Sequence, residues 1–198
     1  MRFISQSLRH TKRELIKRPT NNEALERERE SKDFVEVEGQ YNFAKDNEYF
    51  TPKAVVDYFG RFDYDPSTTP EKAKELQIEN YDTIETNGLL SDWSKYKKIW
   101  INPPFSEKHK FVEKAYETYK NNQDIEIYIL FPIEFLTTRR FYNISNEVGA
   151  KIYIPNGRIP FQSGLGKNGK SPAFGSVIIK IQKSWEVEQV DIKKILGE

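Results

Sequence analysis

Lys98-Ile-Trp-Ile-Asn-Pro-Pro-Phe105 is the stretch on which the fold of this chain depends. Its first half is short and apolar, which predicts a buried strand. Its second half ends that strand abruptly, because each proline lacks a backbone N–H donor and fixes its own φ angle. The chain therefore leaves the sheet at Asn102 in a rigid loop. Ligands bind at this edge of open α/β sheets, so we expect a ligand site around Asn102.

The segments on either side of this stretch alternate between strand and helix patterns. Apolar runs predict further strands at residues 125–131, 151–154 and 176–182. Between them, residues 106–119 place Phe111, Ala115 and Tyr119 on one face of a helix, with Ser106 as its cap. Two strands joined by a loop close the chain, and residues 158–161 are expected to continue the first of them. The pattern as a whole predicts an α/β fold.

The composition excludes several kinds of site. The chain has 198 residues, which fits one domain with an appendage. It has no cysteine, so disulfides, a thiolate nucleophile and a cysteine-built zinc site are excluded. With only His10 and His109, neither a histidine-rich metal site nor a Ser-His-Asp triad is expected. No apolar run reaches the ~18–20 residues that a membrane span needs, and the basic N-terminus lacks the apolar core of a secretory signal. We expect a cytoplasmic protein.

Charge is sorted along the chain. Residues 1–20 carry six lysines and arginines against one acid, whereas residues 21–40 carry seven acids against three bases. We interpret residues 1–40 as a charged N-terminal arm, helical or disordered, followed by one domain over residues 41–198. Residues 151–183 carry six bases and no acid. A phosphate backbone is attracted to such a local patch rather than to net charge, so this block points to a nucleic acid.

Two segments before the central stretch suggest a small-molecule site. Thr51 followed by Pro52 is the start signal of a helix, in which Thr51 would be the N-cap. Further on, Phe62-Asp-Tyr-Asp-Pro66 reads as a short strand that ends at an acid, directly before a helix start. An acid in that position often holds a nucleotide-like ligand. Plain helix capping and a plain turn are the competing interpretations.

An apolar strand that ends in Asn-Pro-Pro-aromatic resembles the catalytic motif of amino-group methyltransferases that use S-adenosylmethionine. A series of further motifs, in order along residues 47–182, resembles the phage-type, Dam-like DNA N6-adenine methyltransferases. The matching motifs are Glu48–Pro52, Phe62–Pro66, Asn87–Leu89 with Asp92–Trp93, Asn102–Phe105, Thr138–Arg139 with Phe141, Gly157–Ile159 with Phe161, and Pro172–Ser176.

This resemblance implies a fold and a cofactor. The fold would be the Rossmann-like methyltransferase sheet, mostly parallel with a C-terminal antiparallel hairpin. The cofactor would be S-adenosylmethionine, with no metal. The residues implied to bind it are Phe50, Thr51, Pro52, Asp65, Pro66, Ser67 and Asp92.

The chemistry of adenine methylation explains the catalytic motif. The exocyclic amine of adenine is a poor nucleophile, because its lone pair is delocalised into the ring. Hydrogen bonds from N6–H to strong acceptors localise that pair, and the Asn102 side chain and Pro103 carbonyl are two such acceptors. Pro104 would fix their geometry, which methyl transfer requires. Phe105 would supply a face for the base to stack on after it leaves the duplex.

Basic and aromatic residues elsewhere are candidates for DNA contact, namely Lys108, Arg139, Arg140, Arg158, Phe161, Lys167 and Lys170. Several have a second interpretation. Phe161 is equally a core residue or the second ring around a flipped base. Lys167 and Lys170 lie either on a solvated loop or against phosphates. Arg139 either contacts DNA or supports the catalytic loop.

The sequence therefore predicts a site-specific DNA methyltransferase acting on adenine N6 in duplex DNA, in the host cytoplasm if the protein is phage-encoded. One alternative is methyl transfer to another planar amine, such as cytosine N4 or an adenine in RNA. The other is a non-catalytic DNA-binding protein that retains the fold. The absence of a glycine-rich turn after Asp65 favours that last alternative.

Overall fold

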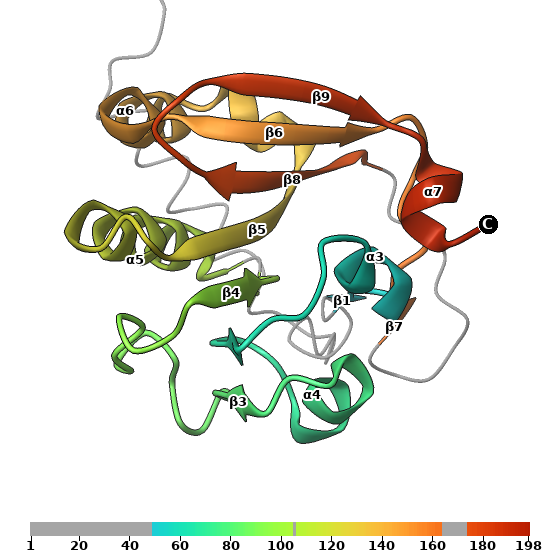
Figure 1. The fold of residues 1–198 in the computed structure, drawn as a ribbon, viewed down its shortest axis with the longest axis horizontal. Helices are drawn as coiled ribbons and strands as arrows, with labels where there is room; N and C mark the ends of the chain where they lie inside the picture. The colour runs from blue at the N-terminus through green and yellow to red at the C-terminus, as the bar shows by residue number, and fades with distance from the viewer. Residues whose placement is uncertain (1–48, 105, 164–173) are drawn as a thin grey trace, which may run out of the picture. The chain divides into compact units, whose positions relative to one another are not determined.

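The structure is a computed structural model that describes residues 49–104, 106–163 and 174–198. The predicted arm over residues 1–40, its boundary, and the predicted site residues Phe105, Lys167 and Lys170 lie outside the described residues. Within the described part, one mixed sheet forms the centre of the fold (Figure 1). Its seven strands follow the order β3 (Asn80–Tyr81), β2 (Tyr64–Asp65), β4 (Lys98–Ile101), β5 (Glu126–Pro132), β8 (Ser176–Ile181), β6 (Ala150–Pro155) and β9 (Glu186–Val190).

Four of the six strand pairings in this sheet are parallel. β2 is parallel to β3 and β4, β4 is parallel to β5, and β6 is parallel to β9. β8 lies between β5 and β6 and is antiparallel to both. The predicted α/β fold, mostly parallel with an antiparallel C-terminal pair, is confirmed. A separate antiparallel ribbon joins β1 (Tyr49–Phe50) to β7 (Gln162–Ser163).

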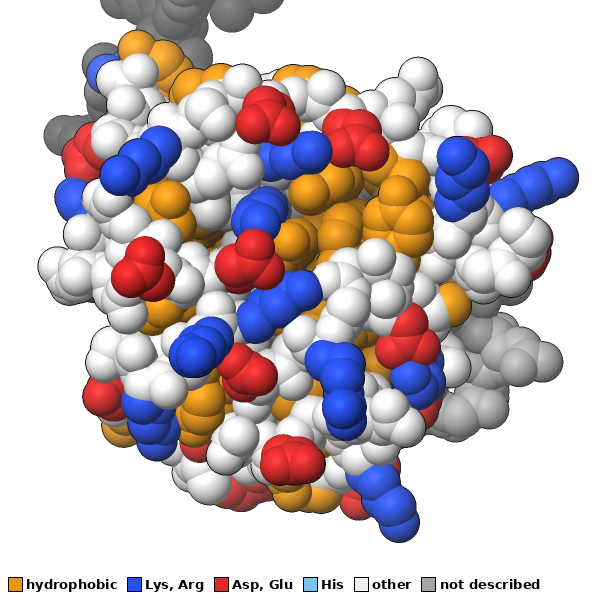
Figure 2. All heavy atoms as spheres, viewed as in Figure 1, with side chains coloured by type: hydrophobic (Ala, Val, Ile, Leu, Met, Phe, Trp, Pro, Cys, Tyr) orange, Lys and Arg blue, Asp and Glu red, His pale blue; other side chains and the backbone are white. Residues whose placement is uncertain are grey.

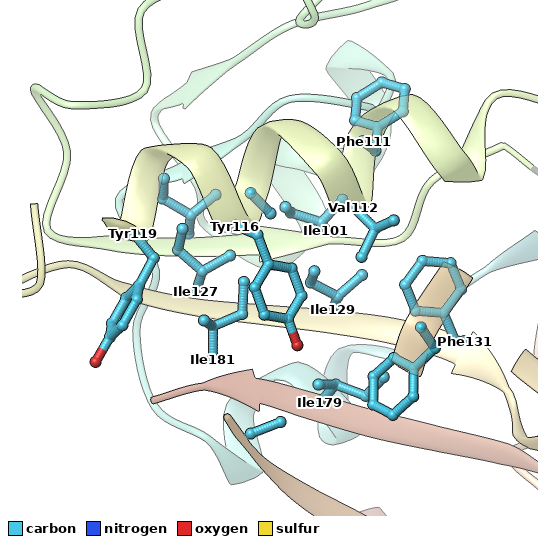
Figure 3. Packing of buried hydrophobic residues seen from close by; sticks show 14 of the residues in the cluster. Ile101, Phe111, Val112, Tyr116, Tyr119, Ile127, Ile129, Phe131, Ile179 and Ile181 are labelled. Carbon is cyan, nitrogen blue, oxygen red and sulfur yellow. The ribbon is translucent and has the colours of Figure 1, made fainter. Parts of the chain in front are cut away.

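One face of the sheet is covered by α5 (Lys108–Asn121), together with α6 (Arg139–Val148) and the 3-10 helix η1 (Ile133–Thr137). Successive strand side chains point to opposite faces, so alternate isoleucines of β4, β5 and β8 lie under α5. Figure 3 shows this packing, in which Phe111, Val112, Tyr116 and Tyr119 lie against Ile101, Ile127, Ile129, Ile179 and Ile181. The predicted apolar face of this helix is therefore confirmed.

The other face carries α3 (Lys53–Tyr58), α4 (Pro70–Leu76) and α7 (Ile192–Leu196). Their apolar side chains pack with Trp100 of β4 and Tyr128 of β5. Where helices do not cover this face, ion pairs lie over aromatic rings. Glu126 pairs with both Lys98 and Lys180, and both lysines lie over the Tyr128 ring. Figure 2 shows lysine and acidic side chains alternating across this face, beside an exposed apolar area.

The C-terminal region differs from the sequence prediction. Residues 158–161 do not continue a strand, because the chain turns at Asn156, which is hydrogen-bonded to the C-terminal segment. The Asn156 N–H donates to the Val190 carbonyl at 2.9 Å, and its side chain accepts from Ile192 N at 2.8 Å. The partners in this turn belong to β9 and α7, two elements that we did not predict. β9 is a polar edge strand whose residues are mostly exposed, so its sequence lacks an apolar run.

Two predicted helix caps are also wrong. Pro52 occupies the N-cap position of α3, and Glu107 occupies that of α5, in both cases without a side-chain hydrogen bond. Thr51 is instead buried, and its hydroxyl makes no hydrogen bond with any described residue. α4 does have a side-chain cap, since Thr69 accepts from Lys72 N. None of the described helices is long and apolar enough to cross a membrane.

Candidate active site

A cavity of about 620 Å³ opens at the carboxyl ends of β2, β4 and β5. Asp65 is the last residue of β2, Asn102 directly follows β4, and Pro132 ends β5. The described residues that line the cavity include Tyr49–Thr51, Asp65–Lys72, Thr83–Glu85, Asn87–Leu89, Asn102–Pro104, Ser106–Lys108, Leu130–Pro132 and Phe161. The site expected at the strand end around Asn102 is therefore a cavity in the fold.

Buried polar groups concentrate in this cavity. Among the described residues, the buried polar and charged side chains are Thr51, Asp65, Thr68, Lys72, Ser145 and Ser176. All of them except Ser145 line the cavity. Burying a polar group costs free energy unless it is paired. Such a concentration makes the cavity the candidate functional site of the described domain.

The Asn102 side chain is held in one orientation. Its Nδ2 donates to the backbone carbonyl of Tyr49 at 2.6 Å. A carbonyl can only accept, so the NH₂ end of the amide must face Tyr49. The Oδ1 end is thereby left as an acceptor, and no described residue donates to it. The Asn102 backbone carbonyl accepts from Ser67 Oγ at 3.3 Å, which links this loop to the end of β2.

Both prolines of the motif line the cavity beside Asn102. Pro103 is buried and Pro104 is exposed. The Pro104 carbonyl accepts from Glu107 N at 3.1 Å, which leads the loop into the first turn of α5. The Pro103 carbonyl takes no part in that turn. It lies next to the Asn102 amide in the sequence, as the second acceptor predicted for the site.

Asp65 is a buried carboxyl group in the cavity wall, only 2% exposed. Burial raises its pKa to about 7, although the Ser67 N–H donates to Oδ1 at 2.9 Å and partly offsets that effect. The Asp65 backbone carbonyl accepts from Asp82 N at 2.9 Å. The loop after β2 is thus fixed on both sides, with a carboxyl group that changes its charge near neutral pH.

The loop over residues 87–91 forms another wall of the cavity and fits closely against the loop after β2. A Cβ added at Gly88 would lie 2.0 Å from the Pro66 carbonyl oxygen, so only glycine fits there. Trp93 Nε1 donates to the Gly88 carbonyl at 2.8 Å. Lys114 of α5 donates to the carbonyls of Leu89 and Ser91, both at 2.6 Å. These contacts hold the Asn87–Leu89 wall against Pro66.

The residues fit a cofactor with an amino-acid end and aromatic rings. Thr51 Oγ1 is buried in the cavity wall and has no hydrogen-bond partner among the described residues. An unpaired buried hydroxyl in a cavity is a group that a ligand can satisfy. The buried carboxyl of Asp65 complements a cation, while Phe50, Trp100 and Leu130 supply apolar wall. S-Adenosylmethionine has cationic, polar and aromatic parts that match these groups.

The structure gathers most of the residues predicted to bind the cofactor, but not all. Phe50, Thr51, Asp65, Pro66 and Ser67 line the cavity. Pro52 and Asp92 are not among its lining residues. The Asp92 carboxylate is exposed and accepts from the backbone N and the hydroxyl of Ser94, at 2.9 and 2.6 Å.

The residues predicted to contact nucleic acid are spread more widely. Lys108 and Phe161 line the cavity, and Phe161 lies edge-on to Tyr49 with ring centroids 6.0 Å apart. Arg139, Arg140 and Arg158 are exposed and lie outside the lining. Arg140 Nε pairs with Glu113 at 3.1 Å.

Sequence reasoning missed several residues of the cavity wall. Lys72 is buried there, yet its position on α4 reads as an exposed charge. Ile84 also lines the cavity and is 88% exposed, in a loop whose sequence carries no strand or helix signal. Gly88 lies in a segment, Asn87–Leu89, that the sequence marks only by its match to the family motif. Its close approach to Pro66 is a tertiary contact that the sequence does not reveal.

Comparison with solved structures finds chains with limited similarity to this one. A Listeria monocytogenes structure assigned as a class I S-adenosylmethionine-dependent methyltransferase shares 13% identity, with a TM-score of 0.37 over 60% of this chain and 44% of that chain. An Agrobacterium tumefaciens structure assigned as an O-methyltransferase shares 9% identity, with a TM-score of 0.34 over 65% of this chain and 64% of that chain.

A sequence relative and a family match are more specific. The DNA N-6-adenine-methyltransferase of Escherichia phage T1 is 31% identical over 159 residues, which cover 70% of this chain. The chain spans 65% of the length of that relative. Residues 42–195 match the family described as DNA N-6-adenine-methyltransferase (Dam). This match confirms the resemblance drawn from the motifs, and the chain belongs to the Dam family of DNA N-6-adenine-methyltransferases.

Proposed function

We propose that this protein transfers a methyl group from S-adenosylmethionine to N6 of adenine in DNA. Membership of the family supports the reaction and the substrate. The observation that carries the proposal is the orientation of Asn102. Its NH₂ end is held by the Tyr49 carbonyl, so its Oδ1 remains as an acceptor at the cavity wall. This acceptor belongs to the Asn-Pro-Pro-Phe motif, which resembles the catalytic motif of the amino-group methyltransferases.

The residues of this loop would prepare the adenine amine for reaction. Asn102 Oδ1 and the Pro103 carbonyl each accept one N6–H, which localises the nitrogen lone pair for attack. Bound S-adenosylmethionine supplies the electrophilic methyl group on a sulfonium. As N6 forms its bond to the methyl carbon, the carbon–sulfur bond would break and its electron pair would stay on the sulfur of the departing S-adenosylhomocysteine. The two acceptors would stabilise the growing positive charge of the amine, and one N6 proton would then pass to water. Neither acceptor needs to ionise, so the loop works without a histidine or cysteine.

The cofactor would occupy the part of the cavity between the loop after β2 and the Asn87–Leu89 wall. Phe50, Thr51, Pro66 and Ser67 would contact it, and the Asp65 carboxylate would complement its cationic centres. Pro52 and Asp92 were predicted with this set but do not line the cavity. They would therefore act on the cofactor only indirectly, by positioning their neighbours in the chain. Pro52 follows Thr51 directly, and Asp92 belongs to the turn after the Asn87–Leu89 wall.

The adenine would enter from the side of the cavity formed by Lys108 and Phe161. A base inside a duplex cannot reach Asn102, so it must leave the stack, at a cost of a few kcal/mol. Stacking on Phe105 and Phe161 would return ~1–3 kcal/mol for the flipped base. We propose that Lys108, Arg139, Arg140, Arg158, Lys167 and Lys170 bind the phosphate backbone.

Labelled methyl transfer to duplex DNA, followed by nucleoside analysis of the product, tests the proposal. N6-methyladenine as the labelled nucleoside is the expected product. Labelled N4-methylcytosine would instead assign the second planar amine, and label on RNA alone would assign the RNA substrate. No label with either nucleic acid, together with no measurable cofactor binding, would favour a DNA-binding protein that retains only the fold.

A further inference from the structure

Lys72 is a buried cation in the wall of the cavity, and no known role of the site accounts for it. Its side chain is 5% exposed. Nζ donates to Gln162 Oε1 at 2.8 Å and to Glu75 Oε1 at 2.9 Å. We propose that Lys72 is a positioning residue, which sets the orientation of the Asn102 amide through Gln162 and the β1–β7 ribbon.

The pairing with Glu75 does not explain why Lys72 is buried. Glu75 lies one turn further along α4 and is 40% exposed, so the two side chains could pair equally well in solvent. Burying an ammonium group is costly unless its partners are held in place. The contact to Gln162 differs from the contact to Glu75, because it joins α4 to a residue 90 positions away in the chain and so constrains the tertiary structure.

Gln162 belongs to a ribbon that needs such an anchor. β1 and β7 are two residues long each, and Phe50 is paired with Gln162 while Tyr49 is paired with Ser163. An isolated two-stranded ribbon is marginally stable in water. A side-chain hydrogen bond from α4 to Gln162 therefore fixes the position of the whole ribbon relative to the cavity.

The ribbon in turn holds the catalytic amide. Tyr49, the first residue of β1, presents the carbonyl that accepts from Asn102 Nδ2 at 2.6 Å. The contacts run from Lys72 to Gln162, across the strand pair to Tyr49, and then to Asn102. Displacement of the ribbon would free the amide to rotate, and Oδ1 would no longer be held toward the cavity.

Lys72 also contacts the loop that would bind the cofactor. Lys72 N donates to Thr69 Oγ1 at 3.2 Å, which caps α4 directly after the Asp65–Thr68 segment. The backbone of Lys72 is thus joined to the cofactor side, and its side chain is joined to the side that holds Asn102. Lys72 therefore contacts both the loop that would bind the cofactor and the ribbon that holds the Asn102 amide.

The catalytic consequence rests on the proposed function, but the effect on the Asn102 amide does not. The test therefore uses two readouts on the full chain. The first is the NMR signal of the Asn102 side-chain amide without ligand, assigned by its loss in Asn102→Ala. The second is methyl transfer under single-turnover conditions, with cofactor affinity measured alongside. The variants are Lys72→Met, Gln162→Leu and the double variant.

We expect both single variants to move the Asn102 amide signals by the same amount, with no further change in the double variant. The transfer rate should fall about 10- to 100-fold, since catalysis is sensitive to displacements of this kind. Cofactor affinity should stay within about threefold. Gln162→Glu keeps an acceptor for Lys72 and should preserve the signals, as should Glu75→Gln, which removes only the negative charge of the other partner.

Unchanged Asn102 amide signals in Gln162→Leu would overturn the proposal. Gln162 is exposed, so this variant tests the contact even if Lys72→Met fails to fold. Additive losses in the double variant would overturn it as well, because they would assign separate roles to the two residues. If the wild-type protein methylates nothing, the proposed function fails, while the NMR comparison still decides whether Lys72 positions Asn102.

Discussion

The side-chain amide of Asn102 donates to the backbone carbonyl of Tyr49 at 2.6 Å, across 53 residues of sequence. This contact fixes which end of the amide faces the cavity. A rotated amide would present hydrogen-bond donors to the donor groups of an amine substrate and could not activate it. In the proposed function, the short β1 strand is therefore part of the catalytic geometry through the backbone carbonyl of Tyr49.

Cofactor affinity is expected to depend on pH through Asp65. Burial raises the pKa of this carboxyl group to about 7 in the free protein. A cationic cofactor beside it would favour the carboxylate and lower that pKa in the complex. Below pH 7 the free protein must then release a proton on binding. Affinity should be full above pH 7 and fall as the pH drops toward 5, by up to about tenfold per pH unit.

Calorimetric titration with S-adenosylmethionine, in buffers of different ionisation enthalpy, measures both the affinity and the released proton. Asp65→Asn should bind with an affinity that does not vary between pH 5 and 7. A wild-type affinity that is flat over the same range would mean that the cofactor's cationic centres lie away from Asp65.

Gly88→Ala should disturb the cofactor side of the cavity. The new Cβ would lie 2.0 Å from the Pro66 carbonyl oxygen, so one of the two loops must move. Overpacking of this kind costs about 1–3 kcal/mol. We expect a lower melting temperature and weaker cofactor binding, measured by thermal unfolding and titration.

Gly175→Ala is the matched control for that substitution. Among the described residues, its added Cβ would meet only Ile133 Cγ2, at an ordinary contact distance of 3.6 Å. Both properties should stay close to those of the wild-type protein. Equal effects of the two substitutions would show that the close approach of Gly88 to Pro66 is not what shapes the site.

Lys114→Met should loosen the Asn87–Leu89 wall from the side of α5. The substitution leaves the carbonyls of Leu89 and Ser91 without their shared donor and removes a cation 5.1 Å above the Trp93 ring. Leaving such groups unpaired costs about 1–3 kcal/mol. Hydrogen exchange over residues 87–93 should speed up and cofactor affinity should fall.

Lys110→Met serves as the control on the same helix. Lys110 is 66% exposed and pairs with Glu107, so its loss should leave both measurements unchanged. If exchange over residues 87–93 were equally fast in Lys110→Met, the helix rather than Lys114 would be responsible.

The salt dependence of DNA affinity should report how many phosphate contacts the protein makes. Lys167 and Lys170 lie in the acid-free block over residues 151–183. Each phosphate contact contributes about 0.9 to the slope of log affinity against log salt. The double substitution of Lys167 and Lys170 to alanine should therefore reduce the slope by up to about 1.8, measured by titration of fluorescent duplex DNA. A slope equal to that of the wild-type protein would place both lysines outside the interface.

Local sequence patterns predicted the elements that bury regular apolar faces. The α5 helix was recognisable because Phe111, Ala115 and Tyr119 recur at helical spacing. The strand that ends at Asn102 was recognisable because two prolines stop it. β9 and α7 were missed, since an edge strand exposes most of its side chains and a five-residue helix shows little periodicity.

The candidate site was predictable where its residues belong to one motif, and not where it depends on distant contacts. Asn102 and Asp65 follow directly from strand ends. Lys72 donates to Gln162 across 90 residues of sequence, and the need for glycine at position 88 depends on Pro66. Neither contact can be predicted from the local sequence. Thr51 illustrates the opposite error, since a residue that looks like a helix cap is instead a buried hydroxyl in the cavity wall.

The most direct test of the central claim is single-turnover methyl transfer to duplex DNA by Asn102→Ala, with cofactor affinity measured on the same protein. Asn121→Ala, at the exposed end of α5, is the control. Loss of a preorganised hydrogen-bonding group typically lowers a rate by about 10²–10³. We expect a loss of at least that size in Asn102→Ala, with cofactor affinity within about twofold of the wild-type value. Transfer at the wild-type rate would contradict the assignment of Asn102 as the acceptor that activates adenine N6.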